Sequence, residues 1–95
     1  MSDLIKTRLV NIRKHRSTSV VRIDRTSRFG NPFYIGKDGN REEVIEKYEQ
    51  YFYKRIDQDR KFRWAVAALK GLTLACWCTP LPCHGDIIIA YLEEN

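Results

Sequence analysis

The chain has 95 residues, of which 43% are hydrophobic and 31% charged, and its formal net charge at pH 7 is +5. This length suits one domain over residues 1–95, and the composition excludes a largely disordered chain. No apolar run approaches the ~20 residues that span a bilayer, and the first residues lack the apolar stretch of a secretory signal. We therefore expect a cytoplasmic protein with no membrane partner, whose three cysteines are reduced thiols.

Two short strands are expected near the N-terminus. Residues 8–12 and 19–24 are β-branched stretches flanked by polar residues. The basic connection over residues 13–17 makes an antiparallel hairpin the simplest arrangement. The positive charge gathers here, since the sequence up to Phe29 holds eight Lys and Arg residues against two Asp. Such a region attracts phosphates or nucleic acid, or it is only a solvated face.

A long loop then leads into two helices. The loop, residues 25–39, is punctuated by Gly, Asn and Pro, and loops of this length are often functional. Asn40 and Glu43 form a capping-box pattern that begins a helix. The buried face of this helix is expected to hold Val44, Ile45, Tyr48, Phe52 and Ile56. A second helix is expected over residues 59–70, with Gly71 as its stop.

The last third predicts a strand and a helix. Residues 72–78 are short and nearly all apolar, which is typical of a buried strand. Residues 86–92 are expected to form a short helix with Asp86 at or near its N-cap, although the three consecutive Ile residues also suit a strand. The order β-β-α-α-β-α predicts a small α/β sandwich, with helices packed on a mixed sheet of about three or more strands.

Every cysteine and one of the two histidines lie between residues 76 and 86. Three thiolates and an imidazole make a legitimate tetrahedral zinc set, which here would be Cys76, Cys78, Cys83 and His84. The spacing is unfavourable, because structural zinc sites usually draw on two separated pairs whose members are about two to four residues apart. No metal is therefore favoured, zinc stays an alternative, and Cys76 is interpreted as a core residue.

We favour a reactive or ligand-binding turn over the zinc site. A strand that ends at Cys78, a Pro-containing turn and a helix that opens near Gly85 form a unit of the kind that binds ligands in open α/β sheets. Cys83 and His84 would lie beside a helix N-terminus, whose dipole lowers a thiol pKa. Either Cys83 or Cys78 would be the nucleophile, and His84 the base. The candidate catalytic residues are Cys78, Cys83, His84 and Asp86, the last of which also suits a helix cap alone.

The long loop is expected to share a pocket with this turn. If the strands at 19–24 and 72–78 run parallel, the loops that follow them emerge at one edge of the sheet, and the two-helix crossover permits this. The candidate ligand-binding residues are Arg25, Arg28, Gly30, Asn31 and Gly85. The arginines would contact phosphate, the amide would orient the ligand, and the glycines would permit close backbone approach. The alternative is an ordinary turn at 31–32, with Phe29 and Phe33 in the core.

Two segments resemble the signatures of an uncharacterised family of short bacterial and phage proteins, known as a domain of unknown function. The segments are residues 28–33 (Arg-Phe-Gly-Asn-Pro-Phe) and 74–86 (Leu-Ala-Cys-Trp-Cys-Thr-Pro-Leu-Pro-Cys-His-Gly-Asp). The resemblance covers roughly residues 19–92 and departs at Phe29, where Trp is expected. It implies a phage or prophage setting and supplies no reaction. It also implies that these residues belong together: Gly30, Asn31, Pro32, Cys78, Cys83, His84 and Asp86.

The sequence thus predicts a small basic α/β domain that binds an anionic, nucleotide-like ligand between residues 25–33 and 78–86. A second interpretation is a non-enzymatic protein that binds nucleic acid or a host protein through its basic N-terminal third. The zinc-binding module is the third. Whether the pocket catalyses a reaction is left open at this point.

Overall fold

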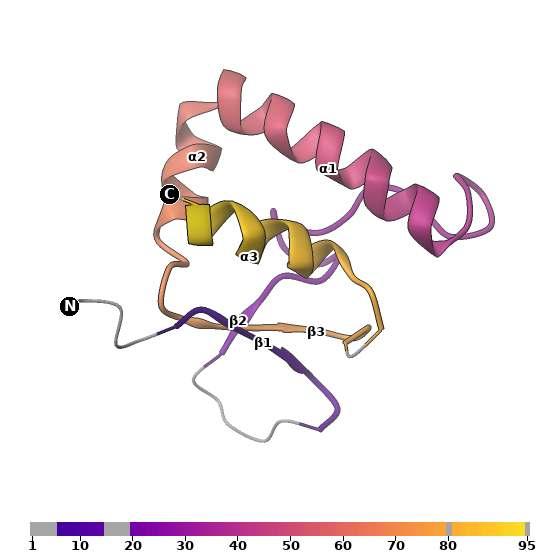
Figure 1. The fold of residues 1–95 in the computed structure, drawn as a ribbon, viewed down its shortest axis with the longest axis horizontal. Coiled ribbons are helices and arrows are strands. Elements are labelled where there is room, and N and C mark those ends of the chain that lie inside the picture. Colours follow the sequence, from indigo (N-terminus) through magenta and orange to yellow (C-terminus); the bar gives the residue numbers. More distant parts are fainter. Residues whose placement is uncertain (1–5, 15–19, 80, 95) are drawn as a thin grey trace.

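Figure 1 shows the computed structural model of the chain, which describes residues 6–14, 20–79 and 81–94. In chain order its elements are β1 (Arg8–Asn11), β2 (Val21–Arg22), α1 (Arg41–Gln58), α2 (Arg60–Ala67), β3 (Thr73–Cys76) and α3 (His84–Glu94). This is the predicted order, and the α/β class is confirmed.

The three strands form a sheet in the order β1-β3-β2. Arg8 of β1 pairs with Thr73, and Val21 of β2 pairs with Leu74, both in parallel. The antiparallel hairpin predicted for the first two strands is therefore wrong, and the described strands form a parallel sheet rather than a mixed one. Leu74, Ala75 and Cys76 are almost completely buried. A central position lets both edges of β3 pair, which satisfies backbone groups that water cannot reach.

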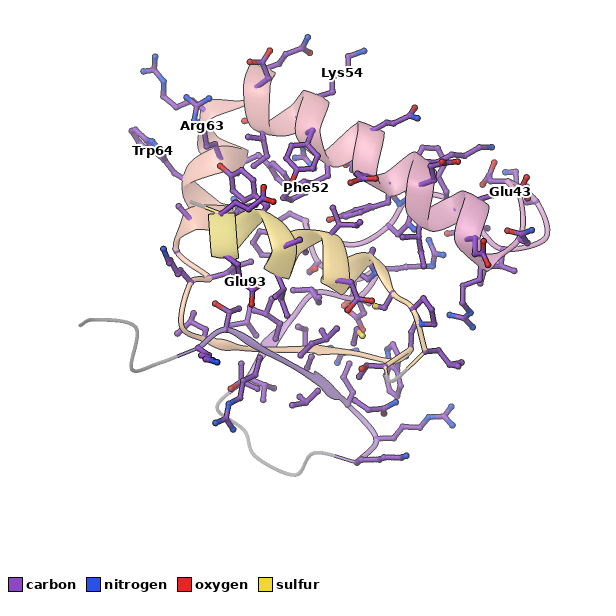
Figure 2. The ribbon with its side chains drawn as sticks, viewed as in Figure 1. Glu43, Phe52, Lys54, Arg63, Trp64 and Glu93 are labelled. Atoms are coloured by element: carbon purple, nitrogen blue, oxygen red, sulfur yellow. The ribbon has the colours of Figure 1, made fainter. Side chains whose placement is uncertain are left out.

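The three helices lie on the same face of this sheet (Figure 1). The capping box at Asn40 and Glu43 is present at the start of α1, as predicted. Figure 2 shows Phe52 pointing from α1 toward the other helices, whereas Lys54 points away from the sheet. The ring of Phe52 lies against four other aromatic rings, with centroids 5.3–5.8 Å away, those of Tyr48, Tyr53, Phe62 and Tyr91. The aromatic core therefore fixes α1 over α2 and α3.

Two helix boundaries differ slightly from the prediction. Helix α2 ends at Ala67, but Leu69 is still buried in the turn that follows, and Gly71 stops this turn with φ +83°. Helix α3 begins at His84, and its consecutive Ile residues are helical rather than extended. In the described parts of the chain, no helix combines the length and apolar character that membrane crossing requires.

Helix α3 is capped by one side chain of its own first turn, that of Asp86. Cys83 precedes the helix, and its N–H donates to the Asp86 carboxylate over 3.0 Å. Gly85 brings the helix close to the sheet, because a Cβ there would lie 2.8 Å from a Leu9 methyl and 2.9 Å from an Ile23 methyl. Because its carboxylate accepts the Cys83 N–H, Asp86 lies near the N-cap of α3, as expected, and caps the helix.

The Gly30→Ala substitution should destabilise the loop after β2. A Cβ at position 30 would lie 2.5 Å from the Asp24 carbonyl oxygen and 2.6 Å from the Arg25 Cα, so the backbone must move. We expect a loss of about 2 kcal/mol in the free energy of unfolding, measured by urea denaturation. Gly85→Ala is the matched control, because its Cβ meets only side-chain ends that can turn aside. A loss at Gly30 no larger than that at Gly85 would contradict this account.

Candidate functional site

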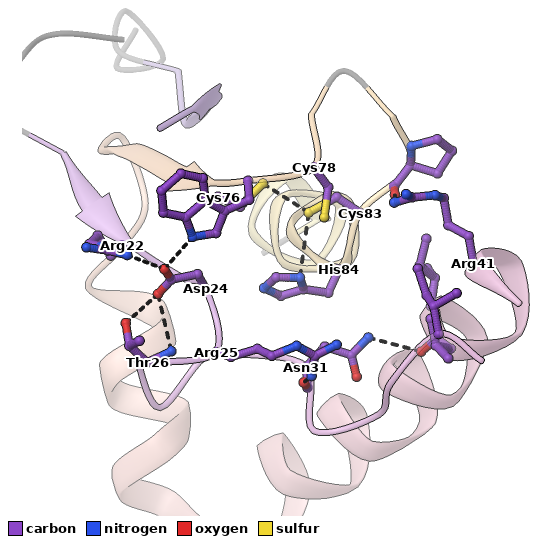
Figure 3. A pocket seen from close by; sticks show the side chains of 15 residues that line it. Arg22, Asp24, Arg25, Thr26, Asn31, Arg41, Cys76, Cys78, Cys83 and His84 are labelled. Atoms are coloured by element: carbon purple, nitrogen blue, oxygen red, sulfur yellow. Dashed lines mark hydrogen bonds and ion pairs between the residues drawn. The ribbon is translucent and has the colours of Figure 1, made fainter. Parts of the chain in front are cut away.

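The loop after β2 and the turn after β3 leave the same edge of the sheet, because the two strands are parallel. A pocket of about 430 Å³ lies between them and is closed on one side by the start of α1 (Figure 3). The lining residues come from all three segments: Arg22, Asp24, Arg25, Thr26, Asn31, Ile35, Arg41, Val44, Ile45, Cys76, Trp77, Cys78, Pro82, Cys83 and His84.

The pocket joins the two segments that the sequence singled out. Its walls include five of the predicted site residues, Arg25, Asn31, Cys78, Cys83 and His84. The part that each plays with a ligand or in a reaction stays a prediction.

The other four predicted site residues do not line the pocket. Arg28 is exposed, and its carbonyl accepts a hydrogen bond from Arg55 over 3.4 Å. Gly30 and Gly85 allow close packing within the protein, and Asp86 caps α3. Gly30, Gly85 and Asp86 thus serve the packing and capping of the chain rather than the lining of the pocket.

Asn31 and Arg25 hold the loop in shape. The buried amide of Asn31 donates to the Val44 carbonyl over 3.2 Å, and its oxygen accepts the Phe33 N–H over 2.9 Å. The Arg25 guanidinium donates to the carbonyls of Asn31 and Phe33 and lies 4.0 Å from the centroid of the Tyr34 ring. The Arg25 charge is therefore held in place at the pocket wall.

Asp24 is a site residue that the sequence analysis missed. It is only 5% exposed, and its carboxylate accepts hydrogen bonds from Arg22, from the Thr26 hydroxyl over 2.6 Å and from the Trp77 indole N–H over 2.9 Å. Burial raises the pKa of Asp24, but these hydrogen bonds outweigh it and hold the pKa at about 2. Asp24 lies two residues after β2, and its partner Trp77 directly follows β3, so the residues beside Asp24 carry no signal of this contact.

His84 is buried at the floor of the pocket with a defined tautomer. Its Nε2 lies 2.6 Å from the Ile23 carbonyl oxygen, which can only accept, so Nε2 carries the proton. Nδ1 is then an acceptor, 3.6 Å from the Cys83 sulfur. Burial lowers the pKa of His84, so the ring is neutral at pH 7. It can therefore accept a proton from Cys83.

Cys83 also lies 3.1 Å from Cys76, measured between the sulfurs. All three cysteines are free thiols, and Cys78 is the least buried of them. The hydrogen bond from Cys83 lowers the pKa of Cys76, whereas the pKa of Cys83, which keeps the shared proton, is raised. Cys76 belongs to the core, as predicted, and it is also one half of a thiol pair.

Among the residues that the structure describes, no three or more Cys, His, Asp and Glu side chains are placed to hold a metal ion. Zinc binding stays a prediction from the sequence alone.

Comparison with known proteins shows the family. The protein-family model described as "Domain of unknown function (DUF4326)" matches residues 10–94. The chain belongs to this family. It is 43% identical over 82 residues to a protein of Enterobacteria phage T4, described as an uncharacterised 12.4 kDa protein in the nrdA-td intergenic region. The match covers 85% of this chain and 72% of the phage protein. No solved structure matches this DUF4326 chain.

These matches confirm the expectation of an uncharacterised family that includes a phage protein. The two short segments that suggested the family are not tested individually by the matches. The grouping of their residues into one site therefore rests on the geometry described above.

The Asp24 carboxylate should make the stability of this DUF4326 chain depend on pH. Its pKa is about 2 in the folded protein against an ordinary 3.8, so its contribution is present above about pH 4 and is lost as the pH falls through 2. Between these pH values, wild type should lose about 2 kcal/mol more than Asp24→Asn does. Urea denaturation across this range measures the difference. The exposed Asp57 supplies the control Asp57→Asn, which should follow wild type. If the free energy of unfolding fell in parallel with pH for wild type and Asp24→Asn, the low pKa of Asp24 would be contradicted.

Proposed function

We propose that the pocket binds an anionic small molecule that contains an aromatic ring, such as a nucleotide. The observation that carries the proposal is the composition of the pocket's walls. Three arginines, Arg22, Arg25 and Arg41, line it together with Trp77 and several apolar side chains. Its volume of about 430 Å³ falls within the range of small-molecule sites.

Two of the three arginines form no ion pair with a carboxylate in the part of the chain that the structure describes. Arg22 forms an ion pair with Asp24. Arg25 donates to backbone carbonyls, and Arg41 donates to the Pro82 carbonyl over 3.2 Å. Within the described residues, neither Arg25 nor Arg41 forms an ion pair. They come from different segments of the wall, so a phosphate between them would gain charge-assisted hydrogen bonds from two directions.

The remaining wall suits an aromatic base. Trp77 is 47% exposed, and its indole N–H is held by Asp24 over 2.9 Å. Ile45 and Pro82 also line the pocket. Aromatic and apolar side chains stack against nucleobases with little regard to sequence. A base against this surface leaves the phosphate free to reach the arginines.

Arg41→Ala tests this proposal directly. Isothermal titration with nucleoside monophosphates should show tighter binding than with the matching nucleosides, because only the phosphate reaches the arginines. The substitution removes one charge-assisted contact, so it should weaken nucleotide binding by about tenfold or more and leave nucleoside binding unchanged. Circular dichroism would check the fold.

Arg60→Ala is the matched control for Arg41→Ala. Arg60 is an exposed arginine at the start of α2 and lies outside the pocket lining. Equal weakening by both substitutions, or equal affinity for nucleotides and nucleosides, would refute the pocket as the binding site.

A second candidate, nucleic-acid binding, is favoured by the surroundings of Trp77. The guanidinium groups of Arg13 and Arg22 lie 5.6 and 5.7 Å from the centroid of its ring. Arg13 follows β1 and does not line the pocket, so this basic and aromatic surface extends beyond the small-molecule site. Stacking on an aromatic ring beside cationic groups is how single strands are bound without sequence preference. The host-protein alternative stays a prediction from the sequence.

Arg13→Ala separates the two candidates. If a single strand binds across the surface around Trp77, affinity for a labelled single-stranded oligonucleotide should fall steeply with salt. Arg13→Ala should weaken that binding and reduce its salt dependence, while leaving nucleotide binding in the pocket unchanged. Fluorescence anisotropy at several salt concentrations measures both. No binding at low salt, or a loss with Arg41→Ala but not with Arg13→Ala, would exclude this second candidate.

A further inference from the structure

Two thiols meet at the floor of the pocket, although they belong to different elements. Cys76 is the last residue of β3, and Cys83 directly precedes α3. The turn between them folds back so that their sulfurs lie 3.1 Å apart, and both line the pocket (Figure 3). Both are free thiols, and each is almost completely buried. A molecule that enters the pocket therefore meets two sulfurs side by side.

The proton shared with Cys76 and burial raise the pKa of Cys83, so Cys83 needs a base beside it once Cys76 has reacted. The Cys83 sulfur accepts the Gly85 N–H over 3.4 Å, at the first turn of α3. The acceptor nitrogen of His84 lies 3.6 Å from the same sulfur, while the other ring nitrogen is fixed by the Ile23 carbonyl. A neutral imidazole beside a thiol is the arrangement that removes its proton when a nucleophile is needed. Both groups are in place without any rearrangement of the backbone.

We propose that Cys76 and Cys83 form a redox-active dithiol that exchanges with low-molecular-weight disulfides entering the pocket. This activity goes beyond ligand binding and does not depend on it, because it uses only the two sulfurs and His84. The role of Cys76 also goes beyond that of a core residue.

The reaction balances over two steps. The Cys76 thiolate attacks one sulfur of a disulfide RSSR, which breaks the S–S bond, forms a mixed disulfide on Cys76 and releases RS⁻. His84 then accepts the Cys83 proton, and the Cys83 thiolate attacks the Cys76 sulfur of the mixed disulfide. The second RS⁻ leaves and takes the proton that His84 holds, while the first RS⁻ takes a proton from water in place of the one that Cys76 lost on ionising. The protein has lost two electrons and holds a Cys76–Cys83 disulfide.

Cys78 provides the internal comparison. It lines the same pocket and is the least buried cysteine, so an unselective thiol reagent modifies it first. If Cys76 and Cys83 are a reactive pair, a reagent that joins or bridges two neighbouring thiols should react with them before it reacts with Cys78. The proposal therefore predicts which two of the three cysteines become joined.

The first experiment treats the reduced protein with bis(2-hydroxyethyl) disulfide, an uncharged probe that the arginines of the pocket wall do not attract. Intact-mass and peptide mass spectrometry should show a single internal disulfide between Cys76 and Cys83, with Cys78 still a thiol. Cys78→Ser should form the same disulfide. Cys83→Ser should stop at a mixed disulfide on Cys76. A disulfide that includes Cys78, or an adduct on Cys78 while Cys76 and Cys83 stay reduced, would overturn the proposal.

A second measurement uses the unmodified protein, which removes any doubt about folding of the variants. Phenylarsine oxide bridges two close thiols through one arsenic atom. It should bind wild type with one-to-one stoichiometry and protect Cys76 and Cys83, but not Cys78, from later alkylation. Protection of any pair that includes Cys78, or no protection of Cys76 and Cys83, would count against the dithiol. Neither measurement involves a nucleotide, so failure here leaves the ligand-binding proposal standing, and the reverse also holds.

Discussion

The site depends on one contact, the hydrogen bond between His84 and the Ile23 carbonyl. It is 2.6 Å long and joins the first residue of α3 to the segment that leaves β2. Gly85, the next residue, lets the helix come within van der Waals contact of Leu9 and Ile23. Because the start of α3 is held against both outer strands, the turn before it must curve over the end of β3. That curvature brings Cys83 to Cys76 and forms the floor of the pocket.

The walls of the pocket are fixed by a second group of buried contacts, all of which join the long loop to α1. The Asn31 amide donates to the Val44 carbonyl, and the Tyr48 hydroxyl donates to the Phe29 carbonyl over 2.8 Å. Buried backbone carbonyls need such partners, since leaving one unpaired costs about 1–3 kcal/mol. Arg41 completes the enclosure by reaching from the start of α1 to the Pro82 carbonyl. The loop is thus long in sequence but held at several points, which gives the pocket a defined shape.

The sequence predicted the elements and the location of the pocket better than it predicted strand pairing. Capping signals and helical periodicity are local, so Asn40 and most of the buried face of α1 were found correctly, whereas Ile45 is only half-buried and lines the pocket. Pairing is not local: the parallel neighbours of β3 are each separated from it by about 50 residues or more, and a nearby hairpin looked simpler. Asp24 is held as a buried carboxylate by hydrogen bonds from Trp77 and Thr26. Trp77 lies 53 positions away, so the residues next to Asp24 in the sequence do not reveal this contact.

Cys76 shows why burial and chemistry should not be treated as opposing interpretations of a cysteine. The sequence analysis placed it in the core because a buried thiol packs like a small hydrophobic side chain, and it is indeed almost completely buried. The same burial places its sulfur beside that of Cys83 in a region of low dielectric, where one hydrogen bond shifts a pKa far more than it does in water.

The two proposals for the pocket are linked by charge. The arginines that would attract a phosphate also favour a thiolate at the pocket floor, because both are anions in the same positive field. A phosphate bound between Arg25 and Arg41 would compensate that field and add negative charge near the sulfurs. Ligand binding and thiol ionisation should therefore oppose each other, and by linkage the opposition is the same in both directions. A filled pocket would then also be one in which the dithiol is protonated and shielded from disulfides.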